Sequence, residues 1–322
     1  MRTIAIAAGG DSSEYGISVK SAKEVASVLS DRYKLFIIVI RGINWYWEDE
    51  KGRYFTIDKN DFTLKLDDTR VRFDAVFIAI HGTPGENGLL QGYFDMLKIP
   101  YTSCGAFSSA LTFNKQACKL YLKEYDVKMA DAILLRKDDP ADTTKIIDLV
   151  GLPCFVKPND SGSSYGVTKV KKAEDFVRAL ESAYKESNEV LVEQFMNGRE
   201  VACGVVKTRN RKIVLPVTEI ISKNEFFDFE AKYSDGKSDE VTPADLPANV
   251  TEEVQRLSSL ICDLLGCKGI VRVDFIIVKD QPLFLEINTV PGMTKESLIP
   301  KQAEAANIPL AELYSSVIED LF

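Results

Sequence analysis

The segment 271–292, VRVDFIIVKDQPLFLEINTVPG, predicts a β-hairpin that carries polar side chains inside two apolar strands. Arg272 and Asp274 occupy the first strand, and Glu286 and Asn288 occupy the second. Residues two apart on a strand point to the same face, so the members of each pair lie together. An unpaired carboxylate in an apolar environment costs several kcal/mol. These groups therefore need partners, and the partners indicate the function.

Whether the two polar pairs share one face of the hairpin depends on how the two strands are paired. Either an odd number of residues is unpaired in the turn, or a bulge interrupts the pairing. The other face is expected to be core, formed by Val271, Val273, Phe275, Ile277, Leu283, Leu285 and Ile287.

The composition of the polar face predicts a metal site. Two carboxylates and an amide, without His or Cys, form the ligand set that Mg²⁺ prefers beside water and phosphate oxygens. The alternative interpretation is a solvated face held by a salt bridge. We favour the metal site, because both polar pairs lie in long apolar strands that lead into a Pro-Gly turn.

Length and charge bound the class of protein. The chain has 322 residues, of which 45% are hydrophobic, and this predicts two or three domains. The net charge of −8 comes from 40 Lys and Arg against 48 Asp and Glu, which argues against a nucleic-acid-binding protein. The chain contains one histidine, which excludes a His-rich zinc site.

The cysteines and the apolar runs indicate the compartment. The six cysteines form no CxxC motif and lie in apolar contexts, which favours reduced core thiols over disulfides. No apolar run approaches the roughly 20 residues that cross a bilayer. The N-terminal MRTIAIAAGGDSSE has the pattern of a first strand and not of a signal peptide. We therefore expect a cytoplasmic protein that does not enter the membrane.

Strands and helices alternate in the N-terminal third, which we assign to a domain at 1–103. Strands are expected at 3–8, 35–40 and 75–80, and helices at 17–29 and 89–97. Glycine-rich loops follow the first and the third strand. This alternation predicts a doubly wound parallel sheet, with function in the loops at the carboxyl ends of its strands.

The rest of the chain predicts two further domains, at 104–196 and 197–322. The first shows short strands, most clearly CFVKP and VLVEQF, around one helix at 173–184. The second shows longer strands, a helix at 251–264, the hairpin and a final helix. Residues 223–240 are too long and too irregular for a simple connector, and we interpret them as a lid.

Two segments have the composition of a nucleotide site. In CFVKPNDSGSSYGVTKV, 154–170, Gly and Ser allow backbone N–H groups to close over phosphate oxygens beside the Lys157 charge. An ordinary Gly-Ser hairpin turn explains these residues equally well. In VLVEQFMNGREVACGV, 190–205, Glu193 ends one strand and Glu200 begins the next. Such a crossover can serve an adenine edge and a ribose, although a surface-exposed Glu200 is an equal alternative.

Two loops that each follow a strand and precede a helix form another candidate site. GGDSSEYG contributes Glu14, and HGTPGENG contributes His81. A lone histidine is more often structural. This one lies at the carboxyl end of a strand, between an apolar run and a glycine, and the position favours a role in a site. The helix N-terminus nearby favours an anion such as a substrate carboxylate.

Taken in order, the motifs resemble the D-alanine–D-alanine ligases of the ATP-grasp superfamily. The resemblance covers nearly the whole chain through GGDSSEYGIS, HGTPGENGLLQG, NKQACK, VKPNDSGSSYGV, VLVEQFMNGRE, FFDFEAKY, VRVDF and LEINTVPGMTKESLIP. It implies a three-domain α/β and α+β chain. A doubly wound N-terminal domain would precede a small central α+β domain and a C-terminal antiparallel-sheet domain, and the last two would clasp ATP.

The resemblance also implies a role for each residue that matches a family motif. The ATP site would comprise Lys115, Phe155, Lys157, Ser163, Ser164, Glu193, Gln194, Phe195, Met196, Glu200, Lys232 and Phe284. Two Mg²⁺ or Mn²⁺ ions would bind Asp274, Glu286 and Asn288, with Glu286 bridging them. The substrate site would comprise Glu14, His81, Arg272, Gly292, Ser297 and Leu298. The catalytic residues would be Glu14, Ser163, Tyr233, Arg272 and Gly292.

The activity implied by the resemblance is ATP-dependent ligation of two D-alanines through an acyl phosphate, for peptidoglycan synthesis. A hydrogen-bonded triad of Glu14, Tyr233 and Ser163 would tie the lid to the other domains. A homodimer is expected, and neither nucleic acid nor membrane is an expected partner. The alternatives are a ligase of the same fold that prefers D-serine or D-lactate as second substrate, and a non-catalytic nucleotide-binding regulator. The pair Lys232 and Tyr233 favours peptide formation, since relatives that form the lactate ester lack this tyrosine.

Two departures from the family pattern fall outside the metal and phosphate residues. The lid has Phe227 and Phe229 where relatives often have tyrosines, and the GENG loop has Asn87 where an aspartate is usual. These departures bear on lid contacts and kinetics and not on the presence of activity.

Overall fold

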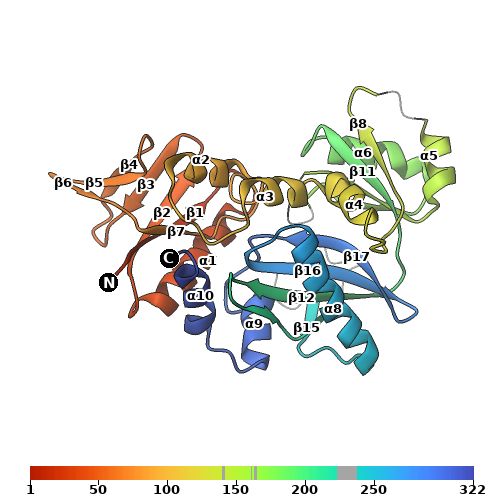
Figure 1. The fold of residues 1–322 in the computed structure, drawn as a ribbon. Helices are drawn as coiled ribbons and strands as arrows, with labels where there is room; N and C mark the ends of the chain where they lie inside the picture. The colour runs from red at the N-terminus through yellow and green to blue at the C-terminus, as the bar shows by residue number, and fades with distance from the viewer. Residues whose placement is uncertain (140–141, 161, 163–164, 223–237) are drawn as a thin grey trace.

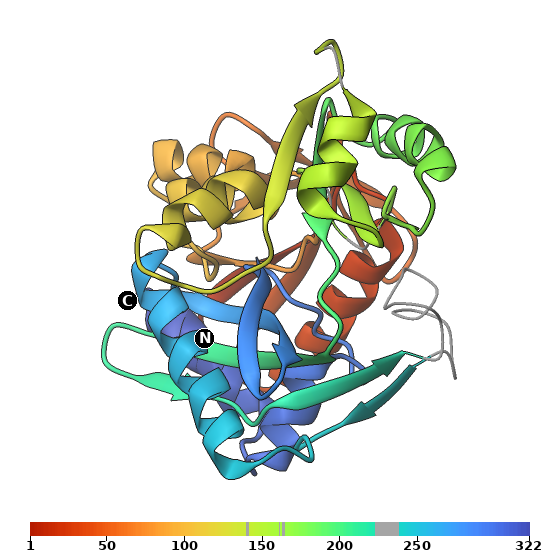
Figure 2. The same cartoon turned by 90° about the vertical axis from the view of Figure 1, so that its right-hand side faces the viewer.

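Three β-sheets organise the chain in the computed structural model, which describes residues 1–322 apart from 140–141, 161, 163–164 and 223–237. Their strand orders are β6-β5-β4-β3-β2-β1-β7, then β10-β9-β11-β8, then β15-β14-β12-β16-β17 with β13 paired to β12. In Figure 1 the N-terminal sheet lies on the left, the central sheet at the upper right and the C-terminal sheet below it. Seen after a 90° turn, the central sheet stands above the C-terminal one (Figure 2).

The N-terminal sheet is built on three parallel strands, which confirms the predicted parallel sheet. These are β1 (Thr3–Gly9), β2 (Lys34–Arg41) and β7 (Ala75–Ile78), with β1 in the middle. An antiparallel extension that the sequence did not predict continues beyond β2. It comprises β3 (Asn44–Glu48), β4 (Tyr54–Asp58), β5 (Thr63–Leu66) and β6 (Thr69–Val71).

The parallel strands are covered on both faces. Ile4 and Ile6 point into one core, whereas Ala5 and Ala7 point into another. The helices that contribute to these cores are α1 (Tyr15–Leu29) and α10 (Leu310–Glu319) on the first face and α2 (Leu89–Leu97) on the second. The last helix of the chain therefore packs against the first (Figure 1).

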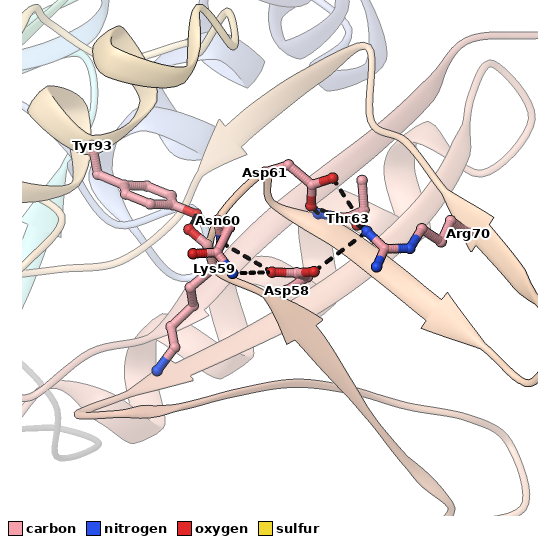
Figure 3. A network of polar contacts seen from close by, with 7 residues as sticks. All are labelled: Asp58, Lys59, Asn60, Asp61, Thr63, Arg70 and Tyr93. Atoms are coloured by element: carbon pink, nitrogen blue, oxygen red, sulfur yellow. Dashed lines mark hydrogen bonds and ion pairs between the residues drawn. The ribbon is translucent and has the colours of Figure 1, made fainter.

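A network of charged groups supports the antiparallel extension (Figure 3). Arg70 Nη1 lies 3.3 Å from Asp58 Oδ2 and 3.4 Å from Asp61 Oδ2. Between these acids and the core, Phe62 adopts a left-handed φ of 53° and is 1% exposed. Its ring centroid lies 6.2 Å from that of Tyr93 in α2. We interpret the network as structural, because its charged groups bond one another next to the buried ring of Phe62.

The central sheet is antiparallel and has one apolar and one polar face. Its strands are β8 (Ala132–Arg136), β9 (Cys154–Pro158), β10 (Thr168–Val170) and β11 (Glu189–Gln194). Val156 and Val192 point into the core beneath its helices. By alternation along the strands, Phe155, Lys157 and Glu193 lie on the opposite face.

Two helices, not the predicted one, cover the apolar face. The predicted helix at 173–184 is present as a 3-10 turn, η1 (Ala173–Asp175), followed by α6 (Phe176–Ala183). The additional helix is α5 (Thr143–Val150), whose N-cap Asp142 accepts a hydrogen bond from the Lys145 N–H at 3.1 Å. Only Ile146 and Val150 of α5 are buried, so its apolar stripe is too short to stand out in the sequence.

The C-terminal sheet has two faces that are covered differently. Its strands are β12 (Arg199–Lys207), β13 (Lys212–Val214), β14 (Thr218–Ser222), β15 (Ser238–Val241), β16 (Gly269–Val278) and β17 (Gln281–Asn288). Val273 and Phe275 belong to a core that is closed by α8 (Ala248–Leu264) and α4 (Lys115–Lys123). Part of the other face is covered by α9 (Leu298–Ala305), where Gln302 accepts the Gly204 N–H at 3.0 Å.

The hairpin of β16 and β17 reaches its register through a bulge. The turn leaves two residues unpaired, since Val278 pairs with Gln281. The pairing then shifts, so that Phe275 faces Phe284 but Asp274 faces Glu286, and Leu285 has no opposite residue. This shift brings both polar pairs to one face, which is the second of the two conditions that the sequence left open.

Because of the bulge, the observed core of the hairpin differs from the predicted one. Ile287 enters the core as predicted, but Phe284 does so in place of Leu283 and Leu285. Leu283 and Leu285 are only partly buried. A single inserted residue reverses the faces of all residues on one side of it.

Residues from one sheet region contribute to the core of another. Cys118 and Leu122 of α4 lie in the C-terminal core, and Leu313 and Tyr314 of α10 lie in the N-terminal core. The helix α3 (Ala106–Phe113) leads into α4 between the N-terminal and central sheets (Figure 1). The division into 1–103, 104–196 and 197–322 stays a prediction.

The six cysteines are buried and free, as expected of core thiols. Within the part of the chain that the structure describes, no helix is both long and apolar enough to cross a membrane.

Candidate active site

A cavity of about 550 Å³ lies between the central and the C-terminal sheet. Its volume suits a small-molecule ligand, and the polar faces of both sheets line it. The residues predicted for the nucleotide and metal sites that line this cavity are Lys115, Phe155, Lys157, Glu193, Gln194, Phe195, Met196, Glu200, Glu286 and Asn288.

Two aromatic rings and a lysine gather on the central wall of the cavity. The ring centroids of Phe155 and Phe195 are 6.0 Å apart. Lys169 of β10 holds its ammonium 3.8 Å from the Phe195 centroid and also lines the cavity. Sequence reasoning missed Lys169, because its place opposite Phe155 depends on strand pairing. The rings, tilted by 52° to each other, offer apolar surface of the kind that a nucleobase can contact.

Glu193 is held by two lysines on the same wall. Lys157 Nζ donates to Glu193 Oε2 at 2.5 Å, and Lys119 Nζ bonds to Glu193 Oε1. Burial raises the pKa of the Glu193 carboxyl, but the two ammonium groups outweigh it and hold the pKa below its ordinary value. Sequence reasoning missed Lys119 as well. Its signal was a spacing of four residues from Lys115, which puts both on one face of α4.

Lys115 is placed by the start of α4. Asn114 caps the helix by accepting from the Ala117 N–H at 2.8 Å. Asn159, in the loop after β9, accepts the Lys115 N–H on its carbonyl at 3.0 Å and the Gln116 N–H on Oδ1 at 2.8 Å. The loop after β9 and the helix that begins with Lys115 are therefore joined directly.

The polar face of the hairpin forms the C-terminal wall. Arg272 grips the Asp274 carboxylate with two hydrogen bonds, from Nε at 2.8 Å and from Nη2 at 2.7 Å. Asn288 Nδ2 donates to the same carboxylate at 3.0 Å. Asp274 is 3% exposed, whereas Glu286 lines the cavity. The structure thus brings together all four polar residues of the hairpin.

The donor chemistry of this wall fits a hard divalent cation. Glu286 lies directly opposite Asp274, and the Asn288 side chain lies beside them. The three side chains supply oxygen donors on one face of the hairpin. A carboxylate has more lone pairs than the three hydrogen bonds to Asp274 use. No cluster of three or more His, Cys, Asp or Glu occurs among the described residues, and this set contains only two acids.

The two N-terminal loops meet at the carboxyl ends of the neighbouring strands β1 and β7. The Asp11 N–H donates to the Thr83 carbonyl at 2.9 Å, and Ser12 Oγ donates to the His81 carbonyl at 2.9 Å. Glu14 is 6% exposed at the start of α1. The loops thereby place Glu14 beside the histidine.

Both ring nitrogens of His81 are engaged by the protein. Nδ1 lies 2.7 Å from the Val290 carbonyl and therefore carries the proton, and Nε2 lies 3.0 Å from Ser21 Oγ. Burial lowers the pKa of this imidazole. His81 was predicted to lie near a substrate carboxylate. In this structure it holds the loop after β17, which leads to Gly292.

Glu86 is a site residue that sequence reasoning missed. Its Oε2 accepts the Gly82 N–H at 2.7 Å, and its Oε1 accepts the Val290 N–H at 3.1 Å. Burial, and then the charge of Glu14, raise the pKa of Glu86 to about 7. It lines the cavity, so this carboxyl joins the N-terminal loops to the hairpin wall.

Two glycines show how closely the remaining predicted residues approach. A methyl group on Gly162 would meet Glu14 Oε2 at 2.5 Å, so Gly162 lies against Glu14. A methyl group on Gly292 would meet Ser297 Oγ at 2.6 Å. The structure therefore brings Gly292 and Ser297 together, and it places Glu14 next to Gly162.

Eight predicted residues of the described part do not line the cavity, and they are Glu14, His81, Arg272, Asp274, Phe284, Gly292, Ser297 and Leu298. Phe284 is 1% exposed in the C-terminal core, and Leu285 lines the cavity in its place, because the bulge exchanges the two faces. The Leu298 side chain is buried with Ala202 and Ile220. Four further predicted residues lie outside the described part of the chain, and they are Ser163, Ser164, Lys232 and Tyr233. The same holds for residues 223–237 of the predicted lid.

Comparisons with known proteins agree with one another. Residues 3–104 match the family model described as D-ala D-ala ligase N-terminus, and residues 121–319 match the one described as D-ala D-ala ligase C-terminus. A D-alanine–D-alanine ligase of Phocaeicola vulgatus is 48% identical over 323 residues, which cover 100% of this chain and 99% of the relative.

Solved structures show the same likeness. D-alanyl-alanine synthetase A from Vibrio cholerae superimposes with a TM-score of 0.89 at 29% identity, over 99% of this chain and 98% of that one. The D-Ala:D-Ser ligase VanG of Enterococcus faecalis gives a TM-score of 0.88 at 28% identity, over 100% and 99%. With 48% identity to a curated relative over its whole length, the chain belongs to the D-alanine–D-alanine ligase family.

Proposed function

We propose that the protein joins two D-alanines into D-alanyl-D-alanine for peptidoglycan synthesis and uses ATP to activate the first of them. One observation carries this proposal. A single cavity has Lys115 and Lys157 on its central side and Glu286 and Asn288 on its C-terminal side. This is the arrangement that a triphosphate requires, with cations on one side and groups that hold metal ions on the other.

The reaction couples two transfers. The carboxylate of the first D-alanine takes the γ-phosphoryl group of ATP and becomes an acyl phosphate, and ADP is released. The amine of the second D-alanine then attacks the acyl carbon, a C–N bond forms, the C–O bond to phosphate breaks, and the amine loses a proton. Lys115 and Lys157 would neutralise the phosphates, and Phe155, Phe195 and the backbone after β11 would hold the base.

The loops at the other end of the cavity would bind the amino acids. Glu14 would pair with the ammonium of the first D-alanine, and Ser297 would meet the carboxylate of the second. Arg272 and the Gly292 N–H would donate to the tetrahedral oxyanion. His81 and Glu86 would act indirectly, because they bond the loop that carries Gly292.

The oxygen ligands of the hairpin would hold metal ions. Asp274, Glu286 and Asn288 would bind two Mg²⁺ or Mn²⁺, with Glu286 between them. Bound there, the ions would supply positive charge for the β- and γ-phosphates. Arg272 would keep Asp274 ionised and oriented for this purpose.

The residues outside the described part complete the proposal. Ser163 and Ser164 would close over the phosphates, and Lys232 and Tyr233 would belong to a lid at 223–240. Tyr233 would connect Glu14 with Ser163. Exclusion of water by a lid protects an acyl phosphate from hydrolysis.

A coupled assay tests the function directly. Incubation with ATP, Mg²⁺ and D-alanine should give ADP, phosphate and the dipeptide, the last identified by mass spectrometry. Phosphate release that does not depend on D-alanine would leave only nucleotide binding or simple ATP hydrolysis, and the proposal would be wrong. L-alanine is the matched control substrate and should give no dipeptide.

D-serine as second substrate is the alternative that a specific observation favours. The D-Ala:D-Ser ligase VanG shares the fold at a TM-score of 0.88. Competition between equal concentrations of D-alanine and D-serine, with both dipeptides quantified, separates the two. We expect D-alanyl-D-alanine to dominate, and an excess of the mixed dipeptide would reassign the second site.

The assembly and location are part of the same proposal. We expect a homodimer, which light scattering on the eluted peak measures as mass. We expect the protein to work in the cytoplasm, where its substrate ATP is produced, and fractionation of cells that make the protein tests this.

A further inference from the structure

Lys119 forms the back of a buried three-residue charge cluster. Glu193, Lys157 and Lys119 are 2%, 7% and 5% exposed. Glu193 and Lys157 line the cavity, whereas Lys119 is not part of its lining. Each carboxylate oxygen of Glu193 bonds one lysine, Oε2 on the cavity side and Oε1 behind.

The charges of this cluster do not cancel. Two ammonium groups and one carboxylate leave one positive charge, and burial leaves little solvent to screen it. Without Lys119 the remaining pair of Lys157 and Glu193 would be neutral. The electrostatic attraction that the cluster exerts on an anion in the cavity therefore depends on a residue that does not reach the cavity.

The position of Lys119 is fixed from two sides. It lies one turn after Lys115 on α4, and the start of that helix is joined to the central sheet through Asn159. The neighbouring Cys118 and Leu122 are anchored in the C-terminal core. Burial lowers the pKa of Lys119, and the Glu193 charge opposes that shift.

We propose that Lys119 is a positioning residue for the nucleotide: it neutralises Glu193 from behind, so that Lys157 presents an uncompensated charge to the phosphates of ATP. The inference rests on the proposed function for the identity of the anion. It predicts a role in nucleotide affinity and none in recognition of D-alanine.

The first test removes the charge of Lys119 and keeps most of its volume. Lys119→Met should raise the KM for ATP by about tenfold or more, the effect expected when one unit charge is removed from behind a buried carboxylate in a protein interior. The KM for D-alanine should stay unchanged. Lys123→Met is the matched control, because it removes the same charge from an exposed position of the same helix and should leave both constants unchanged.

The second test restores the charge count by a different route. In the double variant Lys119→Met with Glu193→Gln, the cluster again carries one positive charge, on Lys157. The KM for ATP should therefore fall below that of Lys119→Met. Full recovery is not required, because the resemblance also places Glu193 in the nucleotide site. A purely structural role of Lys119 predicts no such recovery of nucleotide affinity, even if the double variant is more stable than the single one.

Calorimetric titration with Mg²⁺-ADP in the absence of D-alanine gives the same comparison without turnover. Weaker binding by Lys119→Met that recovers in the double variant supports the inference. Equal affinity in the wild type and Lys119→Met, or a double variant as weak as the single one, overturns it. The outcome is separate from the proposed function, which fails only if the wild type does not couple phosphate release to D-alanine. If Lys119→Met does not fold, Lys119→Gln, which also removes the charge, takes its place in both tests.

Discussion

Asp274 and Glu286 lie directly opposite each other on β16 and β17, because Leu285 is inserted as a bulge between Phe284 and Glu286. In the register that the turn begins, Asp274 would face Leu285, and the acids would point to opposite faces of the hairpin. The single unpaired residue therefore assembles the polar wall of the cavity. Phe284 already faces Phe275 in the turn register and lies in the core, whereas Leu285 is left at the cavity.

Replacement of Glu286 should abolish turnover without unfolding the protein. Glu286→Gln keeps the size of the side chain and removes the charge proposed to hold both metal ions. We expect a loss of at least about 100-fold in kcat, in the range seen when a group that stabilises transition-state charge is removed. Phosphate release with ATP, Mg²⁺ and D-alanine measures the rate. The exposed Glu304→Gln controls for the lost charge, and near-normal rates for Glu286→Gln would refute the metal assignment.

Replacement of Arg272 should affect both stability and rate. Arg272→Met leaves the buried Asp274 carboxylate without its bidentate partner, and loss of one partner of a buried pair costs about 3 kcal/mol or more. Arg272→Lys keeps the charge but lacks the planar fork, so it should recover part of the stability and little of the rate. Urea unfolding and kcat measure the two effects. If the Arg272→Met variant is as stable as the wild type, the Arg272–Asp274 pair makes no net contribution to the free energy of unfolding.

Some of the site was predictable because it depends on local spacing. The alternation in β1 places Ile4 and Ile6 on one face of the sheet and Ala5 and Ala7 on the other. The pattern of apolar strand, glycine loop and helix predicts the parallel sheet. The meeting of the two N-terminal loops follows from the adjacency of β1 and β7. Family motifs then identified ten of the residues that line the cavity.

The rest depends on relationships that no local pattern contains. Lys119 and Glu86 act through partners 74 and 204 residues away, Glu193 and Val290. The bulge at Leu285 has no signature in LFLEIN, where each residue suits a regular strand. Such features are set by tertiary packing, which overrides local preference.

A methyl group on Gly162 should disturb the substrate site through Glu14. In Gly162→Ala the new carbon would lie 2.5 Å from Glu14 Oε2, so the carboxylate must move while the backbone can stay. Misplacement of a substrate-positioning group by about 1 Å can cost 100-fold. We expect the KM for D-alanine to rise and kcat to fall, with KM for ATP little changed. Gly92→Ala in α2 is the control, since no atom lies within 4 Å of its added carbon. Equal effects of the two variants would argue against a role for Glu14.

The pH dependence of stability should report Glu86. Burial and the charge of Glu14 raise its pKa in the folded protein to about 7, from 4.5 as the ordinary value. Between these values the folded state holds a proton that the unfolded state has lost. The corresponding contribution to stability is complete below about pH 4.5, falls as the pH rises and is lost above about pH 7. Its full size is about 3 kcal/mol, since a tenfold change in proton affinity corresponds to about 1.4 kcal/mol.

Glu86→Gln should remove this pH dependence and leave a constant offset. Glutamine keeps one acceptor for the two N–H groups of Gly82 and Val290, so the variant loses about one hydrogen bond at every pH. The difference in unfolding free energy between wild type and variant should therefore move in favour of the variant from pH 5 to pH 8. Urea titrations at four pH values measure it, and Glu304→Gln controls for the change in net charge. Because the carboxyl bonds the loop after β17, a wild type and a Glu86→Gln variant with parallel pH curves would mean that Glu86 is ionised throughout. In that case the two N–H donors outweigh burial and the Glu14 charge, and the loop is held by a permanent anion.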